Sequence, residues 1–137
     1  MIKRYVHGDA KTDNKLFAAV GAMALNPKIH TELGNAITSI NGDVWYLWFD
    51  EINKLFGFCQ TRKLKNGKVH IRFLYAEGLG MKIKNELIGW VLADVRTEGV
   101  TEIYTNDRNN SGMWGLLGFK ADETKKCGAF VKWEKLL

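Results

Sequence analysis

The segment YAEGLGMKIK, from Tyr75 to Lys84, combines two glycines with two lysines ahead of an amphipathic stretch. At Gly78 and Gly80 the absence of a side chain lets the backbone turn tightly and come close to a ligand. The N–H groups that follow would join the free N–H groups of a helix N-terminus, which together bind anions. Lys82 and Lys84 would otherwise lie where the helix dipole disfavours cations. The spacing therefore predicts a phosphate-binding loop; the alternative is a plain strand-to-helix turn with solvated lysines.

The elements around this loop follow from the apolar spacing. The segment after it has the clearest helical pattern in the chain, with an apolar stripe that runs to a natural stop at Gly99. Before it, Asn66-Gly67 separates two β-like runs, from about Leu55 to Arg62 and from Val69 to Tyr75. This arrangement is typical of a hairpin, so the loop should join a hairpin strand to a helix.

The remaining segments complete the order of elements. Four further strands are expected over Ile2–Val6, Val44–Phe49, Thr101–Thr105 and Ala129–Glu134, with another one starting at Phe119. A helix begins near Asp13, a second apolar stripe runs from Ile29 to Ile40, and Asn109–Leu117 suits a short helix. The order β-α-α-β-β-β-α-β-α-β-β predicts an α/β (α+β) fold. Its mixed central sheet should have about six to seven strands, flanked by about four helices.

Length and composition limit the class of protein. The chain has 137 residues, 46% of them hydrophobic, and we expect residues 1–137 to form a single domain. The net charge of +5 suits an acidic ligand. Two cysteines and no Cys/His cluster predict neither a disulfide scaffold nor a metal site. Without a signal peptide or a membrane span, a cytoplasmic location is expected, with no membrane partner.

Three segments, in this order, resemble the GNAT superfamily of N-acetyltransferases over essentially the whole chain. The opening IKRYVHGD is similar to the first strand of the family, and the stretch from Phe73 to Asn106 is similar to its cofactor motif of strand, glycine loop, helix and strand. The closing segment has an aromatic residue, Trp114, four positions before the pair Gly118-Phe119, as in the C-terminal signature of the family.

The resemblance implies a cofactor, a reaction and a set of binding residues. The cofactor would be acetyl-CoA or another acyl-CoA, and the acyl group would move to a primary amine of a small molecule or a protein. A backbone N–H on the strand before the loop, at Leu74 or Tyr75, would polarise the thioester carbonyl. The cofactor-binding residues implied in this way are Leu74, Tyr75, Gly78, Leu79, Gly80, Met81, Lys82, Asn106 and Trp114.

Two positions depart from the family pattern. Tyr75 stands where the family has Gln or Arg at the head of the glycine loop. Trp114 stands where a tyrosine usually protonates the leaving thiolate, and an indole cannot serve as that acid near neutral pH. Tyr104 or Ser111 is then the candidate acid, with water as the alternative. Glu77 is the candidate base beside the loop, and His70 and Asp107 are the other titratable groups near the expected cleft, although family members often act without a dedicated base.

Two other classes of function stay open at this point. A catalytically degenerate GNAT-fold binding protein would retain the cofactor site without turnover. A nucleic-acid-binding or nucleic-acid-modifying protein would use the basic hairpin of residues 62–72, although lysines commonly do no more than protect exposed strand edges. A homodimer is possible, since dimers are common in the family.

Overall fold

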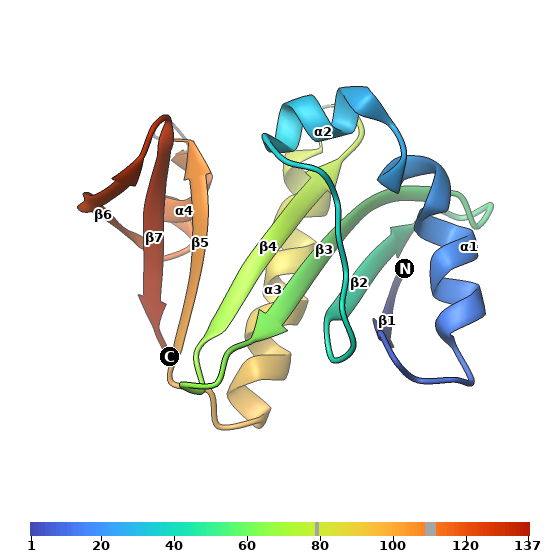
Figure 1. The fold of residues 1–137 in the computed structure, drawn as a ribbon, viewed down its shortest axis with the longest axis horizontal. Helices are drawn as coiled ribbons and strands as arrows, with labels where there is room; N and C mark the ends of the chain where they lie inside the picture. The colour runs from blue at the N-terminus through green and yellow to red at the C-terminus, as the bar shows by residue number, and fades with distance from the viewer. Residues whose placement is uncertain (79, 109–111) are drawn as a thin grey trace.

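The computed structural model describes residues 1–78, 80–108 and 112–137, which form one seven-stranded sheet and four helices (Figure 1). The strands are β1 (Ile2–Val6), β2 (Val44–Phe49), β3 (Leu55–Lys63), β4 (Val69–Ala76), β5 (Glu102–Arg108), β6 (Lys120–Cys127) and β7 (Phe130–Leu136). The helices are α1 (Asp13–Ala24), α2 (Pro27–Leu33), α3 (Met81–Thr97) and α4 (Gly112–Leu116). The strand order is β1-β2-β3-β4-β5-β7-β6, and the predicted element order is confirmed.

The second helix is shorter than its apolar stripe indicated. That stripe predicted a helix as far as Ile40, but α2 ends at Leu33. Gly34 adopts the left-handed conformation with φ of 79°, and its N–H bonds to the carbonyl of Thr31, which closes the last turn. The segment after it crosses the sheet as an irregular strand-like loop, so the prediction beyond Leu33 was wrong.

Helices cover both faces of the sheet (Figure 1). One core lies between the sheet and α3, and the other lies between the opposite face and helices α1 and α2. Strand β2 shows why both cores form: Tyr46 packs into the first, while its neighbours Trp45 and Leu47 pack into the second. Each of these three side chains is at most 1% exposed. The prediction that this aromatic strand is covered on both faces is confirmed.

The sheet opens between β4 and β5. These two strands are parallel and pair at three positions, Val69 with Ile103, His70 with Tyr104, and Ile71 with Thr105. The hydroxyl of Thr105 donates to the carbonyl of Ile71 over 2.9 Å at the last pair. Beyond it, residues 72–76 of β4 and 106–108 of β5 diverge without pairing to each other (Figure 1). The crossover through α3 brings the carboxyl ends of both strands to this opening.

A β-bulge in β4 coincides with the start of this opening. Gln60 of β3 pairs with Phe73 and Thr61 pairs with Ile71, so Arg72 has no partner in the register. The bulge brings the consecutive side chains of Arg72 and Phe73 to the same face of the sheet, where the guanidinium carbon lies 4.9 Å from the ring centroid.

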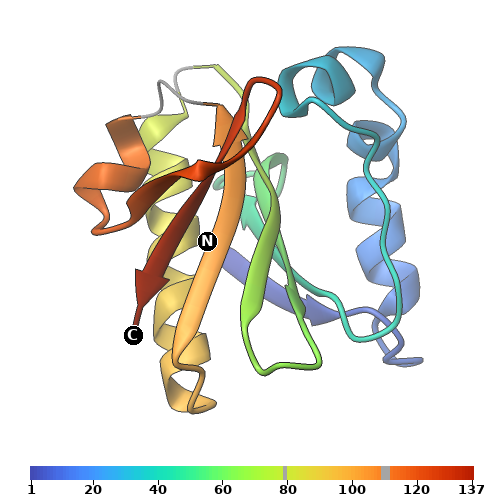
Figure 2. The ribbon, with the colours of Figure 1, turned by 60° about the vertical axis from the view of Figure 1, so that its left-hand side comes forward.

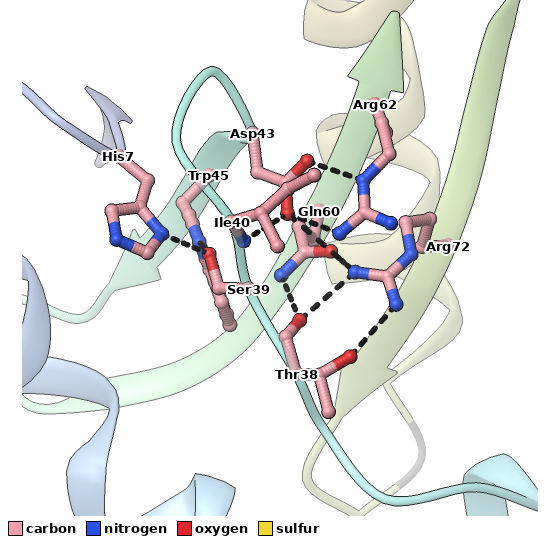
Figure 3. A network of polar contacts seen from close by, with 9 residues as sticks. All are labelled: His7, Thr38, Ser39, Ile40, Asp43, Trp45, Gln60, Arg62 and Arg72. Carbon is pink, nitrogen blue, oxygen red and sulfur yellow. Dashed lines mark hydrogen bonds and ion pairs between the residues drawn. The ribbon is translucent and has the colours of Figure 1, made fainter. Parts of the chain in front are cut away.

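The loop between α2 and β2 is held on that face by the Asp43 network, which we define as Thr38, Asp43, Gln60, Arg62 and Arg72 (Figure 3). The Asp43 carboxylate is fully buried and accepts two hydrogen bonds of 2.7 Å from Arg62. Arg72 donates to both the carbonyl and the hydroxyl of Thr38 at 2.9 Å. Because these charges and amides satisfy one another, the loop has a defined path despite lacking regular structure.

Helix α2 bridges the open end of the split. Arg108 of β5 donates to the carbonyl of Thr31 over 3.2 Å. Phe130, at the start of β7, lies so close to Gly34 that a Cβ there would overlap its ring. Figure 2 shows the β6–β7 hairpin reaching toward α2 above the diverging strands. Among the described residues, no helix is long and apolar enough to cross a membrane.

Candidate active site

A cavity of about 120 Å³ occupies the split between β4 and β5. It draws its walls from both strands, from the first turn of α3, from α2 and from α4. Its lining includes the predicted residues Leu74, Met81, Asn106 and Trp114. The structure therefore brings together four of the residues that the resemblance implied for the cofactor, although they come from four different elements.

The N-terminus of α3 lies at the mouth of this cavity. The first bond of the helix runs from the N–H of Lys84 to the carbonyl of Gly80, so the N–H groups of residues 81–83 have no acceptor within the helix. Within the described residues, no side chain caps this end. An anion at this position would accept hydrogen bonds from several N–H groups at once.

The two loop glycines have different roles. Gly78 has φ of 63°, which a residue with a side chain rarely adopts, and a Cβ there would meet open space. Gly80 has a negative φ, but a Cβ there would overlap the Cβ of Ala76. Gly80 thus lets α3 pack closely on β4, a steric role in addition to the ligand approach that the sequence predicted. Leu79, another predicted cofactor residue, lies outside the described residues.

The two lysines of the first turn diverge. Lys84 lines the cavity, whereas Lys82 lines a separate groove beside Trp48 and Phe49 of β2. The structure does not bring Lys82 to the split, because side chains two positions apart on a helix point in different directions. Lys84, which the sequence analysis placed beside the predicted anion together with Lys82, is thus the one of the two that reaches the cavity.

Trp114 is a wall of the cavity with its polar atom engaged. Its side chain is 1% exposed, its ring packs edge-on against Phe119 at 5.0 Å, and its indole N–H donates to Asp107 over 2.6 Å. The indole therefore orients the Asp107 carboxylate, which also lines the cavity. Trp114, seven positions after Asp107 in the sequence, thus helps to hold the Asp107 carboxylate at the cavity.

Tyr104, one candidate acid, lies at the paired base of the split; the other, Ser111, lies outside the described residues. Its ring stacks on His70 at 4.6 Å, and the Lys132 ammonium lies 4.5 Å from the ring centroid. Burial raises the pKa of its hydroxyl, and the nearby charge of Lys68 opposes that rise. The hydroxyl is thus protonated at neutral pH, but Tyr104 is not among the residues that line either cavity.

Glu77, the candidate base, directly follows the last residue of β4. Its backbone N–H donates to the carbonyl of Phe56, and its side chain does not line the cavity. Burial, followed by the charges of Glu32 and Glu77, raises the pKa of Tyr75. Of these residues, Glu32 lines the cavity itself. Sequence reasoning missed Glu32, because only the fold brings α2 over the split.

A second cavity of about 280 Å³ continues the first on the α2 side of the sheet. The two share Leu33, Arg72, Phe73 and Asn106, so they are adjacent, and we call the two cavities together the passage. Its outer wall is the β6–β7 hairpin, through Lys125 and Phe130. A ligand bound in the first cavity would thus lie next to a second molecule bound in the second cavity.

Three of the five Lys and Arg side chains in the basic hairpin of residues 62–72 form ion pairs within the fold. Arg62 and Arg72 contact the buried Asp43, and Lys68 forms a 3.0 Å ion pair with Glu102. Three of the cations that motivated a nucleic-acid interface therefore hold the fold together. The structure does not support the nucleic-acid alternative.

Comparison with protein-family models gives no match, and comparison with curated proteins gives none either. Solved structures do match. An acetyltransferase of the GNAT family from Staphylococcus aureus Mu50 is 12% identical with a TM-score of 0.66, over 100% of this chain and 99% of that one. An acyl-CoA N-acyltransferase from Pseudomonas aeruginosa is 13% identical with a TM-score of 0.74, over 98% of each chain.

This chain has the GNAT fold. The same fold is found in N-acetylglutamate synthase from Neisseria gonorrhoeae, solved with coenzyme A and N-acetyl-glutamate. That protein is 9% identical with a TM-score of 0.61, and the match covers 100% of this chain but 35% of that one. The GNAT resemblance and the mixed sheet predicted from the sequence are thus confirmed at the level of the fold.

Proposed function

We propose that this protein is an acyl-CoA-dependent N-acyltransferase that moves an acetyl group from coenzyme A to a primary amine. The observation that carries the proposal is the split between β4 and β5, which opens beside the uncapped N-terminus of α3. A protein could have the GNAT fold without an open β4–β5 split or without free N–H groups at the start of α3. Here both are present, and a second cavity adjoins the first on the α2 side of the sheet.

The residues at the split fit an acyl-CoA. The free N–H groups of residues 81–83 and the Lys84 ammonium suit the pyrophosphate. Leu74, Met81 and Met113 offer apolar walls to the pantetheine arm. When bound, the cofactor would supply an activated acyl thioester. The backbone of β4 beyond its last pair with β5 is free of that neighbouring strand and can hydrogen-bond an extended ligand.

Glu32 is the base that this geometry favours. The amine must lose a proton to act as a nucleophile, and a carboxylate next to the split can take it directly or through water. Glu32 lines the cavity on the α2 side, and within the described residues it forms no ion pair. Asp107, held by Trp114, supplies a second carboxylate in the same cavity. Tyr104 and Glu77 remain weaker candidates, because neither lines it.

Titration of acetyl-CoA by calorimetry, with desulfo-CoA alongside, tests the cofactor site. We expect micromolar binding that Lys84→Glu weakens at least tenfold, because charge reversal repels the pyrophosphate. Lys82→Glu is the matched control, since it makes the same charge change two residues away on a different surface. An absence of binding at millimolar cofactor would overturn the proposal. Cofactor binding without release of free thiol on any amine would identify a binding protein instead.

A further inference from the structure

We propose that the acceptor is a small amine that also carries a carboxylate and an apolar side chain, as an amino acid does. Its carboxylate would be bound by Lys125 and Arg72 in the second cavity. This proposal rests on the proposed function, because it names the substrate class for the same site. It excludes polycationic acceptors such as aminoglycosides.

The charge of the second cavity points to a carboxylate. Among the described residues, its lining includes two cationic side chains, Arg72 and Lys125, and no acidic one. His70, which also lines it, reports the local potential: after burial, the charges of three cations lower the pKa of its imidazole to about 4. Those three cations are Arg62, Arg72 and Lys132. The imidazole is therefore neutral at pH 7, and the positive charge in the lining of the cavity comes from Arg72 and Lys125.

Nearby carboxylates do not cancel this charge. Lys125 lies 3.4 Å from Asp122 and 3.5 Å from Glu134, and its side chain is 54% exposed. Exposed ion pairs of this kind contribute about 0–1 kcal/mol, so the ammonium can turn to a ligand. Glu134 is moreover shared with Lys132, at 3.0 Å. Arg72 shares the single carboxylate of Asp43 with Arg62.

The two cavities differ in charge where their walls are not shared, and the shared walls include the polar side chains of Arg72 and Asn106. Glu32 lines the first cavity and not the second, and its charge suits the ammonium of an acceptor. Lys125 lies in the second cavity, on the hairpin. Leu33 and Phe73 line both cavities, and Phe130 adds an aromatic wall to the second. A zwitterion with an apolar side chain matches this set of surfaces.

Matched pairs of acceptors test the proposal. L-Phenylalanine and phenethylamine differ only in the carboxylate, as do L-leucine and isopentylamine. We expect kcat/KM for acetyl transfer, and affinity for the protein saturated with coenzyme A, to favour the amino acid at least tenfold. Lys125→Glu should remove that preference or reverse it. Lys126→Glu is the control, because its partner is the exposed Glu123 and it does not line the cavity.

The failures of the two proposals are distinguishable. Wild-type protein that binds no acetyl-CoA would overturn the proposed function, whereas calorimetry with each acceptor alone would still test the carboxylate site. Equal affinity for acid and amine, a preference for an aminoglycoside, or an equal effect of Lys126→Glu would overturn the acceptor class alone. Retention of the tenfold preference in Lys125→Glu would also overturn it.

Discussion

The Asp43 network and the passage at the β4–β5 split use the same kinds of side chain but leave them in different states. In the network, the Asp43 carboxylate is fully buried and bonded to Arg62 and to the N–H of Ile40. In the passage, Glu32 and Lys84 face a cavity. Charged side chains that line a cavity are available to bind a ligand or transfer a proton. Charged side chains that form ion pairs with one another, as in the Asp43 network, stabilise the fold instead.

Arg72 belongs to both regions. The β-bulge sends its side chain to the α2 face, where it bonds to the loop at Thr38 and also lines both cavities. The network therefore fixes the position of a cation at the edge of the passage. The same contacts make Arg72 a poor choice for testing substrate binding, because its loss would also release the loop.

The largest effect should come from Glu32→Gln, which removes the proposed base from the passage. We expect kcat/KM for acetyl transfer to fall about 10²–10⁴-fold, while stability to urea stays within about 0.5 kcal/mol. Steady-state kinetics with the best amine acceptor, over a range of pH, gives the measurement. Glu123→Gln, at an exposed position on β6, serves as the control. Unchanged kinetics in Glu32→Gln would assign the proton transfer to another group.

In the network, Asp43→Ala should reduce the free energy of unfolding by about 3–5 kcal/mol, because it leaves two arginines without their buried partner. Urea denaturation followed by circular dichroism measures the loss. Asp122→Ala removes a partly exposed carboxylate and should change stability by no more than about 0.5 kcal/mol. Similar losses in both variants would show that the network has no special role.

Gly80→Val should destabilise the protein by about 1–3 kcal/mol, because its side chain would overlap Ala76 where α3 packs on β4. Gly89→Ala, in the same helix with open space around it, should be neutral or stabilising. Thermal unfolding of both variants measures the difference. If Gly80→Val is as stable as the wild type yet binds acetyl-CoA poorly, the glycine serves the ligand and not the packing.

The smallest effect concerns pH. The pKa of His70 is about 4 in the folded protein, against 6.5 for an ordinary histidine. Between these values the unfolded chain binds a proton that the folded protein does not, so stability should fall as pH drops from about 6.5 to 4. Because the ring is partly solvated, the loss attributable to His70 should be on the order of 1 kcal/mol. Urea midpoints at pH 7 and pH 5 should differ less in His70→Phe than in the wild type.

The order of elements could be predicted from the sequence, because each strand and helix has a local pattern. The hairpin signal at Asn66-Gly67 and the stripe that runs to Gly99 both correspond to observed elements. The prediction of a helix beyond Leu33 was wrong, because apolar residues at helical spacing do not reveal where the backbone turns left-handed. Gly34 was the available signal.

The site was predictable where its residues belong to a recognisable sequence motif, as Trp114 does in the closing segment. Leu74, Met81 and Asn106 follow from the motif of strand, loop, helix and strand, and all three line the cavity. Glu32 and Lys125 come from elements that the fold brings across the sheet, and neither has a local pattern that marks it. The bulge at Arg72 was likewise hidden, because two consecutive residues on one face break the alternation used to read a strand.

The brief contact between β4 and β5 also bears on how the chain folds. Strands β1 to β4 pair as antiparallel neighbours, and β5, β7 and β6 form a second antiparallel set. Three residue pairs and the α3 crossover join the sets, with Arg108 and Phe130 adding contacts to α2. Backbone pairing is therefore sparsest at this junction, although one core, which contains Tyr46 and Ile103, joins both sets. The amides of the last three strands should exchange with solvent through partial openings that leave the first four strands intact.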